Sequence, residues 1–339
     1  MRYMEPTSQE VRMRKDLVQR FTKLITSFKM DVSVRPVGSY VTGLYLPTSD
    51  IDMVITSLRR TRINSTDYLS LYKLINKIRN SGFASQVEDV LRASVPLIRI
   101  TDKITGIQID LTAADTHAVK ATEAVQKWLQ HSSPAKPLLF VVKMFLSIRR
   151  CGTTYTGGIN SYALFWMVVA WVKLEMPKKK PMISFSDYDS LTTTLGGLSM
   201  SKENAAASSS DLEGVDLGEL LMEFLKFYGE EFDYERNAIE IAPTPSYSTK
   251  PYCYSLTQSY LLSIYDPANT SIDMGSKAYG IKHIQESFKS AYQRLVYLES
   301  KRKSGRRVGE AGILGSVLGG DYTKFVEKRR LAVARIPNI

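Results

Sequence analysis

The sequence predicts an α+β protein in which a mixed α/β unit is followed by a helical region. Short runs of alternating apolar and polar residues predict strands between residues 32 and 116, with a helical pattern between them. From about residue 119 the apolar residues recur at helical spacing, and residues 156–174 are apolar nearly all round, which is typical of a central helix. The 339 residues are enough for two or three domains.

A predicted helix precedes the mixed unit. Thr7 and Glu10 have the spacing of a capping box, and apolar residues then repeat at helical spacing as far as Phe28. Within the mixed unit, apolar residues alternate with Gln108 and Asp110, which predicts a strand over residues 106–111. The other predicted elements are strands at 32–37 and 95–100, a strand that begins near Ile51, and a helix at 66–80 that ends before Ser81 and Gly82.

The second part of the chain is predicted to be helical. Prolines at 134 and 137 separate its first two helices. Residues 199–214 are polar and low in complexity, which predicts a flexible loop, and the Gly- and Arg-rich tail from residue 303 is expected to be mobile. The predicted helices are 119–131, 137–150, 156–174, 217–228 and 280–302.

The net charge of +11 favours a polyanionic partner, with nucleic acid as the first candidate. Dense basic runs occur at 178–180, 301–307 and 328–330, and each is equally consistent with a solvated loop or tail. The longest apolar run near the middle of the chain, 163–172, is shorter than the ~20 residues of a membrane span, so no membrane partner is expected.

The cysteines and histidines argue against a zinc site or a disulfide framework. Cys151 and Cys253 are in no CxxC motif, and the three histidines are scattered. A reducing compartment is expected. Because the first residues contain no apolar segment, secretion is not expected.

Three aspartates form the strongest chemical signal. Asp50 and Asp52 flank Ile51 where a strand begins, so their side chains are expected on the same side of it. Two carboxylates so close repel each other, and a divalent cation removes that conflict. Asp110, on a second strand, is a candidate third ligand. Three carboxylates around two Mg²⁺ ions suit in-line nucleotidyl transfer.

Gly38 and Ser39 strengthen this prediction. Glycine lets a backbone approach a phosphate closely, and the serine hydroxyl adds a donor. A second pair of this kind, in residues 187–189, lies in a polar stretch without a following strand or a preceding Gly-Ser, so we interpret it as a solvated loop.

These residues resemble a known signature. Gly38-Ser39, ten residues, Asp50-Ile51-Asp52 and a distant Asp110 are similar to the motif of the DNA polymerase β-like nucleotidyltransferases. The segment GSYVTGLYLPTSDID more closely resembles the noncanonical poly(A) polymerases of the DNA polymerase sigma type, which supply the polymerase of the TRAMP complex. The resemblance covers about residues 4–300 and continues in the blocks VVKMFLSIRR (141–150), TGGINSYALFWMV (156–168), LGELLMEFLKFYGEEFDYE (217–235) and SIYDPANTSIDMGSKAYGI (263–281).

The resemblance implies a nucleotidyltransferase palm, made of a mixed β-sheet with flanking helices, and a helical central domain, with the nucleotide cleft between them. The expected domains are an N-terminal helix that packs on the central domain (1–30), the catalytic palm (31–118), the PAP-associated central domain with the flexible loop 199–214 (119–302), and a basic mobile tail (303–339).

The resemblance also implies residue roles. Asp50, Asp52 and Asp110 would be the catalytic metal ligands, with Mg²⁺ as the ion and Mn²⁺ as a substitute. Gly38 and Ser39 would bind the triphosphate end. In the central domain, Lys143 would neutralise phosphate charge, Ser161 would contact phosphate and Tyr162 would stack on the base. Asn160 and Asp273 would also contact the nucleotide, the latter within a segment (266–279) similar to the family's nucleotide recognition motif.

Each of these central-domain residues has a structural alternative. Lys143 could be a surface lysine, Tyr162 could pack in the core, and Asn160 could only cap the helix that follows it. By composition alone, residues 266–279 are a turn-rich loop.

Two positions depart from the family pattern. His117-Ala118 stands where the family usually carries Asn-Gly near the ribose, so His117 either replaces that contact by a hydrogen bond or only packs. Ser276-Lys277 stands where an arginine is common, so the choice of base is less secure than the reaction type.

The function that follows from the resemblance is template-independent transfer of AMP from ATP to an RNA 3′ end, in RNA processing or surveillance. The chain contains no RRM-like aromatic signature and no zinc knuckle, so a zinc-knuckle RNA-binding subunit and a helicase are expected partners by family resemblance. A nuclear location follows from the same resemblance, although an organellar relative would look much the same.

Three other functions are consistent with parts of the sequence. A terminal uridylyltransferase would share the palm and differ in a few contacts to the base. A catalytically silent RNA-binding or scaffold subunit is disfavoured by the intact acidic triad, and a small-molecule nucleotidyltransferase fits the long central domain poorly.

Overall fold

The computed structural model divides the chain into two compact units. The first unit consists of Met1–Trp128 together with Gly320–Ile339, and the second of Leu129–Gly319. The boundary between them thus falls later than the expected one after residue 118. The structure describes residues 4–57, 66–92, 95–113, 116–129, 135–179, 216–251, 258–306, 312–318, 326–327, 329–331 and 334.

The first unit is built on a five-stranded mixed sheet with the strand order β1-β2-β5-β4-β3. β2 and β5 are parallel, and the other neighbours are antiparallel. The sequence did not predict β3, because this edge strand is largely polar and lacks an apolar pattern. The strands are β1 (Val32–Pro36), β2 (Ile51–Ser57), β3 (Ala84–Val90), β4 (Leu97–Asp102) and β5 (Gln108–Ala113).

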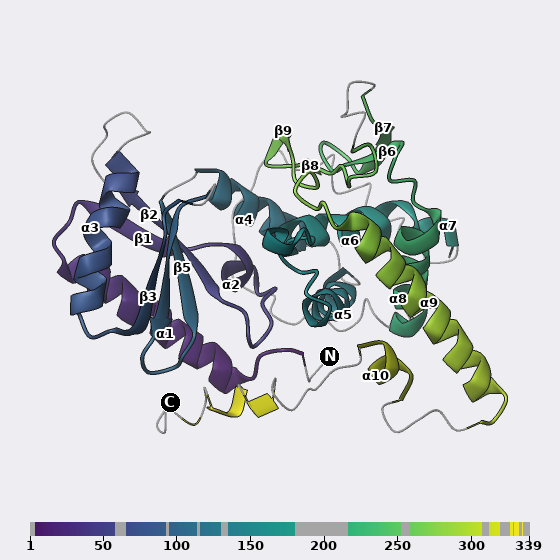
Figure 1. The fold of residues 1–339 in the computed structure, drawn as a ribbon, viewed down its shortest axis with the longest axis horizontal. Coiled ribbons are helices and arrows are strands. Elements are labelled where there is room, and N and C mark those ends of the chain that lie inside the picture. The colour runs from purple at the N-terminus through teal and green to yellow at the C-terminus, as the bar shows by residue number, and fades with distance from the viewer. Residues whose placement is uncertain are drawn as a thin grey trace, which may run out of the picture. The chain divides into compact units, whose positions relative to one another are not determined.

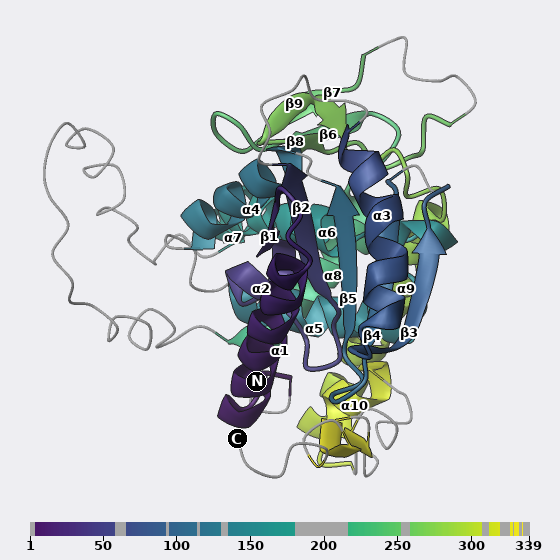
Figure 2. The same cartoon turned by 90° about the vertical axis from the view of Figure 1, so that its left-hand side faces the viewer.

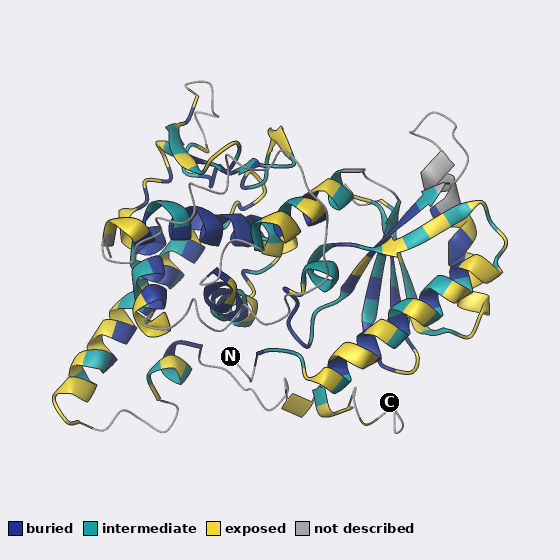
Figure 3. Ribbon diagram, turned by 180° about the vertical axis from the view of Figure 1, so that it is seen from behind, coloured by how far each residue is buried: buried dark blue, intermediate teal, exposed yellow. Residues whose placement is uncertain are grey.

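Two helices, α1 (Ser8–Ser27) and α3 (Thr66–Asn80), cover one face of this sheet, as Figures 1 and 2 show. The short helix α2 (Gly38–Thr42) lies on the other side, and α4 (Thr116–Leu129) ends the unit. The capping box predicted at Thr7 and Glu10 is confirmed. The buried strand positions alternate with more exposed ones (Figure 3).

The N-terminal helix α1 packs on the sheet of the first unit. Four apolar side chains of α1 belong to the same buried cluster as the inward residues of the sheet and of α3. The physical reason is that α3 alone does not cover a five-stranded apolar face, so a second helix must bury the rest of it. The α1 residues in the cluster are Met13, Leu17, Phe21 and Ile25.

The end of the chain also joins the first unit. The Arg329 guanidinium donates to both carboxylate oxygens of Glu10, from Nε at 2.7 Å and from Nη2 at 2.7 Å. The Glu10 side chain is itself 4% exposed. The basic tail, predicted to be mobile, therefore contributes a buried ion pair where it is described.

The second unit is helical with two small two-stranded sheets, β6–β7 and β8–β9. Its centre is α6, in which every residue from Ala163 to Val172 is buried. α6 begins later than the predicted 156, since Asn160 caps it and a turn precedes it. The elements are α5 (Ala135–Ile148), α6 (Ser161–Leu174), α7 (Met176–Lys179), α8 (Leu217–Lys226), β6 (Asn237–Glu240), β7 (Ser246–Thr249), β8 (Tyr265–Asp266), β9 (Asn269–Asp273), α9 (Ile281–Lys303) and α10 (Gly312–Leu318).

The described part of the tail is packed in this unit as well. Val317 and Leu318 of α10 are buried, and Arg149 Nη2 donates to the Val317 carbonyl oxygen at 2.9 Å. The predicted loop 199–214 and residues 187–189 lie outside the described residues. Among the helices that are described, none is both long enough and apolar enough to cross a bilayer.

Candidate active site

The sheet places two of the predicted catalytic aspartates side by side. In the parallel pairing of β2 with β5, Asp52 is the direct partner of Asp110. Directly paired residues on neighbouring strands project from the same face, with backbones about 4.8 Å apart. The flanking Ile51 and Ile109 are fully buried on the opposite face, in the core. The register therefore places Asp110 beside Asp52, while Asp50 lies just before the paired part of β2.

Gly38 lies directly against Asp52. A Cβ at Gly38 would be 2.9 Å from Asp52 Oδ2, and the residue has a φ of +66°, which side-chain-bearing residues rarely adopt. Its amide donates to Thr122 Oγ1 at 2.9 Å, and the Thr122 hydroxyl donates in turn to the Ala118 carbonyl. Helix α4 thus positions the glycine turn, and the sequence analysis missed Thr122.

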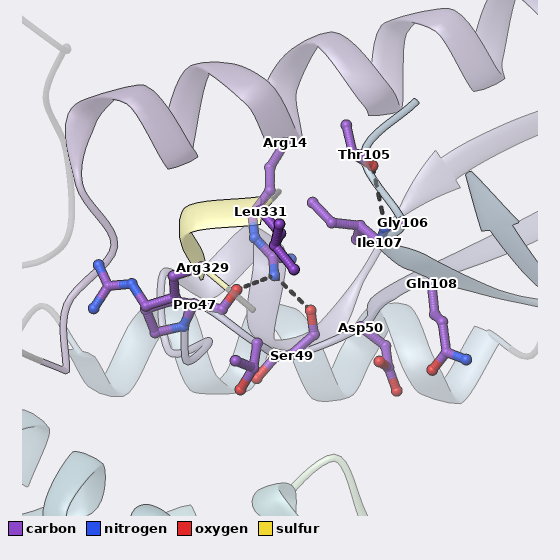
Figure 4. A pocket seen from close by; sticks show the side chains of 11 residues that line it. Arg14, Pro47, Ser49, Asp50, Thr105, Gly106, Ile107, Gln108, Arg329 and Leu331 are labelled. Atoms are coloured by element: carbon purple, nitrogen blue, oxygen red, sulfur yellow. Dashed lines mark hydrogen bonds between the residues drawn. The ribbon is translucent and has the colours of Figure 1, made fainter. Parts of the chain in front are cut away.

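Asp50 follows a loop that a buried arginine holds in place. Arg14, fully buried on α1, donates from Nη2 to the carbonyls of Pro47 at 2.9 Å and Ser49 at 2.6 Å (Figure 4). The guanidinium carbon also lies 4.8 Å from the centre of the Tyr45 ring. Burial lowers the pKa of Arg14, and the nearby charge of Asp50 works in the opposite direction. Arg14 therefore fixes the backbone that carries the first aspartate.

A cavity of about 270 Å³ opens beside this loop. Asp50 lies at its border, and Figure 4 shows the Arg14 guanidinium between α1 and the loop. The Nε and Nη1 of Arg14 have no hydrogen-bond partner in the described structure and are buried. The lining residues are Arg14, Pro47, Thr48, Ser49, Asp50, Thr105, Gly106, Ile107, Gln108, Arg329 and Leu331.

A row of four charged side chains crosses the sheet at the level of the aspartates. Asp52 on β2 pairs with Asp110 on β5, Asp110 with Arg99 on β4, and Arg99 with Glu88 on β3. The Arg99 guanidinium donates to both Asp110 oxygens, from Nε at 3.0 Å and from Nη2 at 3.0 Å. These hydrogen bonds raise the pKa of Arg99.

The chemical type of the candidate ligands suits a hard divalent cation, because Asp50, Asp52 and Asp110 offer the carboxylate oxygens that Mg²⁺ prefers. In the arrangement found, the described acidic, His and Cys side chains form no group of three that could hold a metal ion. Both oxygens of Asp110 accept hydrogen bonds from Arg99. Asp110 is thus near Asp52 but is engaged by an arginine.

The remaining predicted site residues lie in two places. His117 is a half-buried residue at the start of α4, in the first unit. Lys143 is half-buried on α5, and Ser161 is the exposed first residue of α6, both in the second unit.

Two of the alternatives left open by the sequence are answered by hydrogen bonds. The Asn160 side chain accepts from the Ala163 amide at 2.8 Å, so Asn160 does cap α6. Asp273 Oδ1 accepts from the amides of Ile264 and Gly275, and Oδ2 accepts from the Ser263 hydroxyl. Asp273 therefore holds its own loop together, whatever else it contacts.

Tyr162 is half-buried and anchored. Its hydroxyl donates to Asp266 Oδ1 at 2.8 Å, and its ring meets Trp166 edge-on, with 5.9 Å between the ring centres. Burial raises the pKa of Tyr162, and the Asp266 charge raises it further. Core packing is thus part of the role of this tyrosine, while its partial exposure leaves surface for another contact.

The fold and the site resemble those of the DNA polymerase β-like nucleotidyltransferases: a mixed sheet has two parallel neighbouring strands that carry carboxylates beside a glycine turn. Two family models narrow this class. The central palm domain of mitochondrial-like poly(A) RNA polymerases matches residues 1–130, and the Cid1 family poly(A) polymerase model matches residues 216–271. The chain is thus similar in two separate segments to models of poly(A) polymerase families, and the resemblance seen in the sequence is confirmed.

Similar proteins agree with these matches. Poly(A) RNA polymerase protein 1 of Eremothecium gossypii is 28% identical over 98% of this chain and 49% of its own length. The polymerase core of TRAMP, an RNA surveillance complex, superposes with a TM-score of 0.71 at 24% identity, over 94% of this chain and 91% of that one. The Cid1 poly(U) polymerase in its MgGTP-bound form superposes with a TM-score of 0.66 at 19% identity, over 94% of this chain and 95% of that one.

The chain spans about half the length, or less, of the curated relatives it matches first. The structural likenesses are all at low identity and establish the α+β polymerase fold.

Proposed function

We propose that the protein is a template-independent RNA nucleotidyltransferase that transfers AMP from ATP to the 3′ end of RNA and releases pyrophosphate. The observation that carries this proposal is the placement of Asp52 beside Asp110 on neighbouring parallel strands, with Gly38 against Asp52 and Asp50 two residues before it. The relatives named as poly(A) polymerases favour adenylyl transfer.

In this proposal Asp50, Asp52 and Asp110 hold divalent cations, with Mg²⁺ as the ion and Mn²⁺ as a substitute. When bound, such ions neutralise triphosphate charge and lower the pKa of the attacking 3′-hydroxyl. The chain's own contribution is positioning. Arg14 fixes the loop before Asp50, and the absence of a side chain at Gly38 leaves room for the Asp52 carboxylate against the glycine turn.

The nucleotide contacts proposed in the first unit are Gly38 and Ser39 to the triphosphate and His117 to the sugar. In the second unit, Lys143 and Ser161 would contact phosphate and Tyr162 would stack on the base. Asn160 and Asp273 are engaged in capping and in the loop, so we propose that they shape the site and contact nucleotide only through their remaining hydrogen-bonding capacity.

The biological setting is proposed by similarity. A polymerase that resembles the TRAMP core is expected to work in nuclear RNA surveillance or processing, with an RNA-binding zinc-knuckle subunit and a helicase. A net charge of +11 suits the RNA partner.

A nucleotide competition tests the proposed reaction. A labelled RNA with a free 3′-hydroxyl is incubated with the protein, with and without its co-purified partners, and with equal amounts of the four NTPs. We expect adenosine tails. The rate of tailing should fall by about 10³-fold in Asp52→Asn, because this variant loses several kcal/mol of charge stabilisation. Asp89→Asn, at an exposed carboxylate of β3, is the matched control.

Three results would contradict the proposal. Uridine tails under equal competition would make the protein a uridylyltransferase. If neither preparation extends RNA, or if Asp52→Asn extends it as well as wild type, the protein is a binding or scaffold subunit.

A further inference from the structure

The strongest unexplained feature of the first unit is the contact between Arg99 and Asp110. A bidentate arginine–carboxylate pair is the strongest common form of ion pair in proteins, and it engages both oxygens of the carboxylate. Here it engages a carboxylate that the proposed function needs as a metal ligand. The Asp110 side chain is 13% exposed and that of Arg99 34%, so water screens the pair only partly.

Charge explains why an arginine belongs at this position. Asp52 and Asp110 are direct partners on neighbouring strands, and Asp50 is close enough to interact electrostatically with the Arg99 guanidinium. Three carboxylates without a cation would repel one another. The Arg99 guanidinium supplies a positive charge beside this group, next to Asp110.

A second acid lies on the far side of Arg99. Glu88 on β3 is the direct cross-strand partner of Arg99, and its Oε2 lies 3.8 Å from Arg99 Nη1. Its Oε1 accepts a hydrogen bond from Gln86 Nε2 at 2.8 Å, which holds the carboxylate in place. Arg99 therefore lies between two carboxylates, bonded to one and near the other.

We propose that Arg99 is a positioning residue that acts as an internal cation: it holds Asp110 while no metal ion is bound, and it releases Asp110 to the metal by moving its guanidinium toward Glu88. This inference rests on the proposed function, because it takes Asp110 to be a metal ligand. It adds that metal binding competes with an ion pair already present in the protein. Glu88 lowers the cost of that exchange by accepting the displaced arginine.

The exchange predicts opposite effects at the two ends of the ion-pair chain. In Arg99→Gln the competing cation is gone, so metal binding tightens, by roughly tenfold for a partly screened bidentate pair. In Glu88→Gln the displaced arginine has lost its second partner, so metal binding weakens, by about threefold for a less direct contact. Arg99→Lys, which keeps the charge but not the two-point contact, lies between wild type and Arg99→Gln.

The double variant separates this exchange from a simple change of net charge. If Glu88 acts through Arg99, then Glu88→Gln has no further effect once Arg99 is Gln, and the double variant binds metal as tightly as Arg99→Gln alone. If both residues act only through the electric field, their effects add and partly cancel. Two variants at exposed neighbouring residues, Arg92→Gln and Asp89→Asn, measure how much a change of charge alone alters metal affinity.

The measurement is Mn²⁺ binding to the full-length protein without nucleotide or RNA, followed through the EPR signal of free Mn²⁺. Asp52→Asn and Asp110→Asn identify the relevant site, because each should weaken it. Thermal unfolding with and without Mn²⁺ confirms that each variant is folded, and it should show a larger metal-induced rise in Tm for Arg99→Gln than for wild type.

The outcomes distinguish the two levels of the argument. Metal affinity that is unchanged in Arg99→Gln, or a double variant whose effects simply add, overturns the role of Arg99 and leaves the proposed function standing. If Mn²⁺ affinity is unchanged in Asp52→Asn and in Asp110→Asn, no metal binds at these carboxylates. That result overturns both the role of Arg99 and the proposed function.

Discussion

Gly38 and Gly43 form a natural pair for testing how the glycine turn serves Asp52. They stand at the two ends of the short helix α2, and both have left-handed backbones, with φ of +66° and +70°. An added Cβ at Gly43 meets nothing within 4 Å, whereas one at Gly38 would be 2.9 Å from Asp52 Oδ2. Alanine at either position therefore introduces the same backbone strain, but only one of them disturbs the aspartate.

The expected magnitudes follow from that difference. A left-handed conformation costs an alanine about 1–2 kcal/mol, so both variants should lose about this much unfolding free energy. At Gly38 the Asp52 carboxylate must also give way by about half an ångström, from 2.9 Å to an ordinary contact of 3.4 Å. A misplacement of about 1 Å costs about 10²-fold in rate, so a smaller loss is expected here. We expect RNA extension to fall by about 10-fold in Gly38→Ala and by no more than about threefold in Gly43→Ala.

Urea unfolding gives the stability of each variant, and initial rates of labelled RNA extension at saturating ATP give the activity. If the two alanine variants extend RNA equally fast, the contact between Gly38 and Asp52 does not matter for activity and the reasoning is refuted. A Gly43→Ala protein more stable than wild type would refute the reasoning about backbone strain.

Two further predictions concern contacts that support the site. In Arg14→Met, hydrogen exchange of the amides at residues 44–50 should quicken by about tenfold or more, since the carbonyls of Pro47 and Ser49 lose their donor, whereas the exposed Arg12→Met should leave exchange unchanged. For Asp102, burial pulls the pKa upward, but hydrogen bonds from Arg20 and Thr105 outweigh it and hold the pKa below its usual range. Because the folded-state pKa is the lower one, this carboxylate stabilises the fold fully above about pH 4 and progressively less as the pH falls below it. Urea unfolding between pH 2.5 and 7 should therefore show a shallower acid loss in Asp102→Asn than in wild type, and identical slopes would contradict the assignment.

The strands that carry the candidate aspartates could be predicted from the sequence because their patterns are local. The i, i+2 spacing of Asp50 and Asp52 and the alternation around Asp110 follow from strand geometry, and the strands formed within two residues of where they were expected. Asn160 as a cap was also one of the predicted alternatives, since capping depends on neighbours in sequence.

Contacts between distant strands and helices could not be predicted in this way. Arg99 lies in the predicted strand 95–100, but its partner depends on a cross-strand register that no local pattern fixes. Glu88 lies on a polar edge strand that the sequence pattern missed. The packing of α1 on the sheet could not be read from its own sequence, because which apolar face it covers is decided by the sheet.

The ion pair between Glu10 and Arg329 has a consequence for biosynthesis. The ribosome delivers Glu10 before Leu129–Gly319 and Arg329 only after the whole of that segment has been made. During synthesis the Glu10 carboxylate, which is nearly inaccessible to water in the finished protein, lacks its partner Arg329, so the beginning of α1 is less firmly fixed in the nascent chain. A product truncated before Arg329 would retain Asp50, Asp52 and Asp110 but would lack this contact at the beginning of α1.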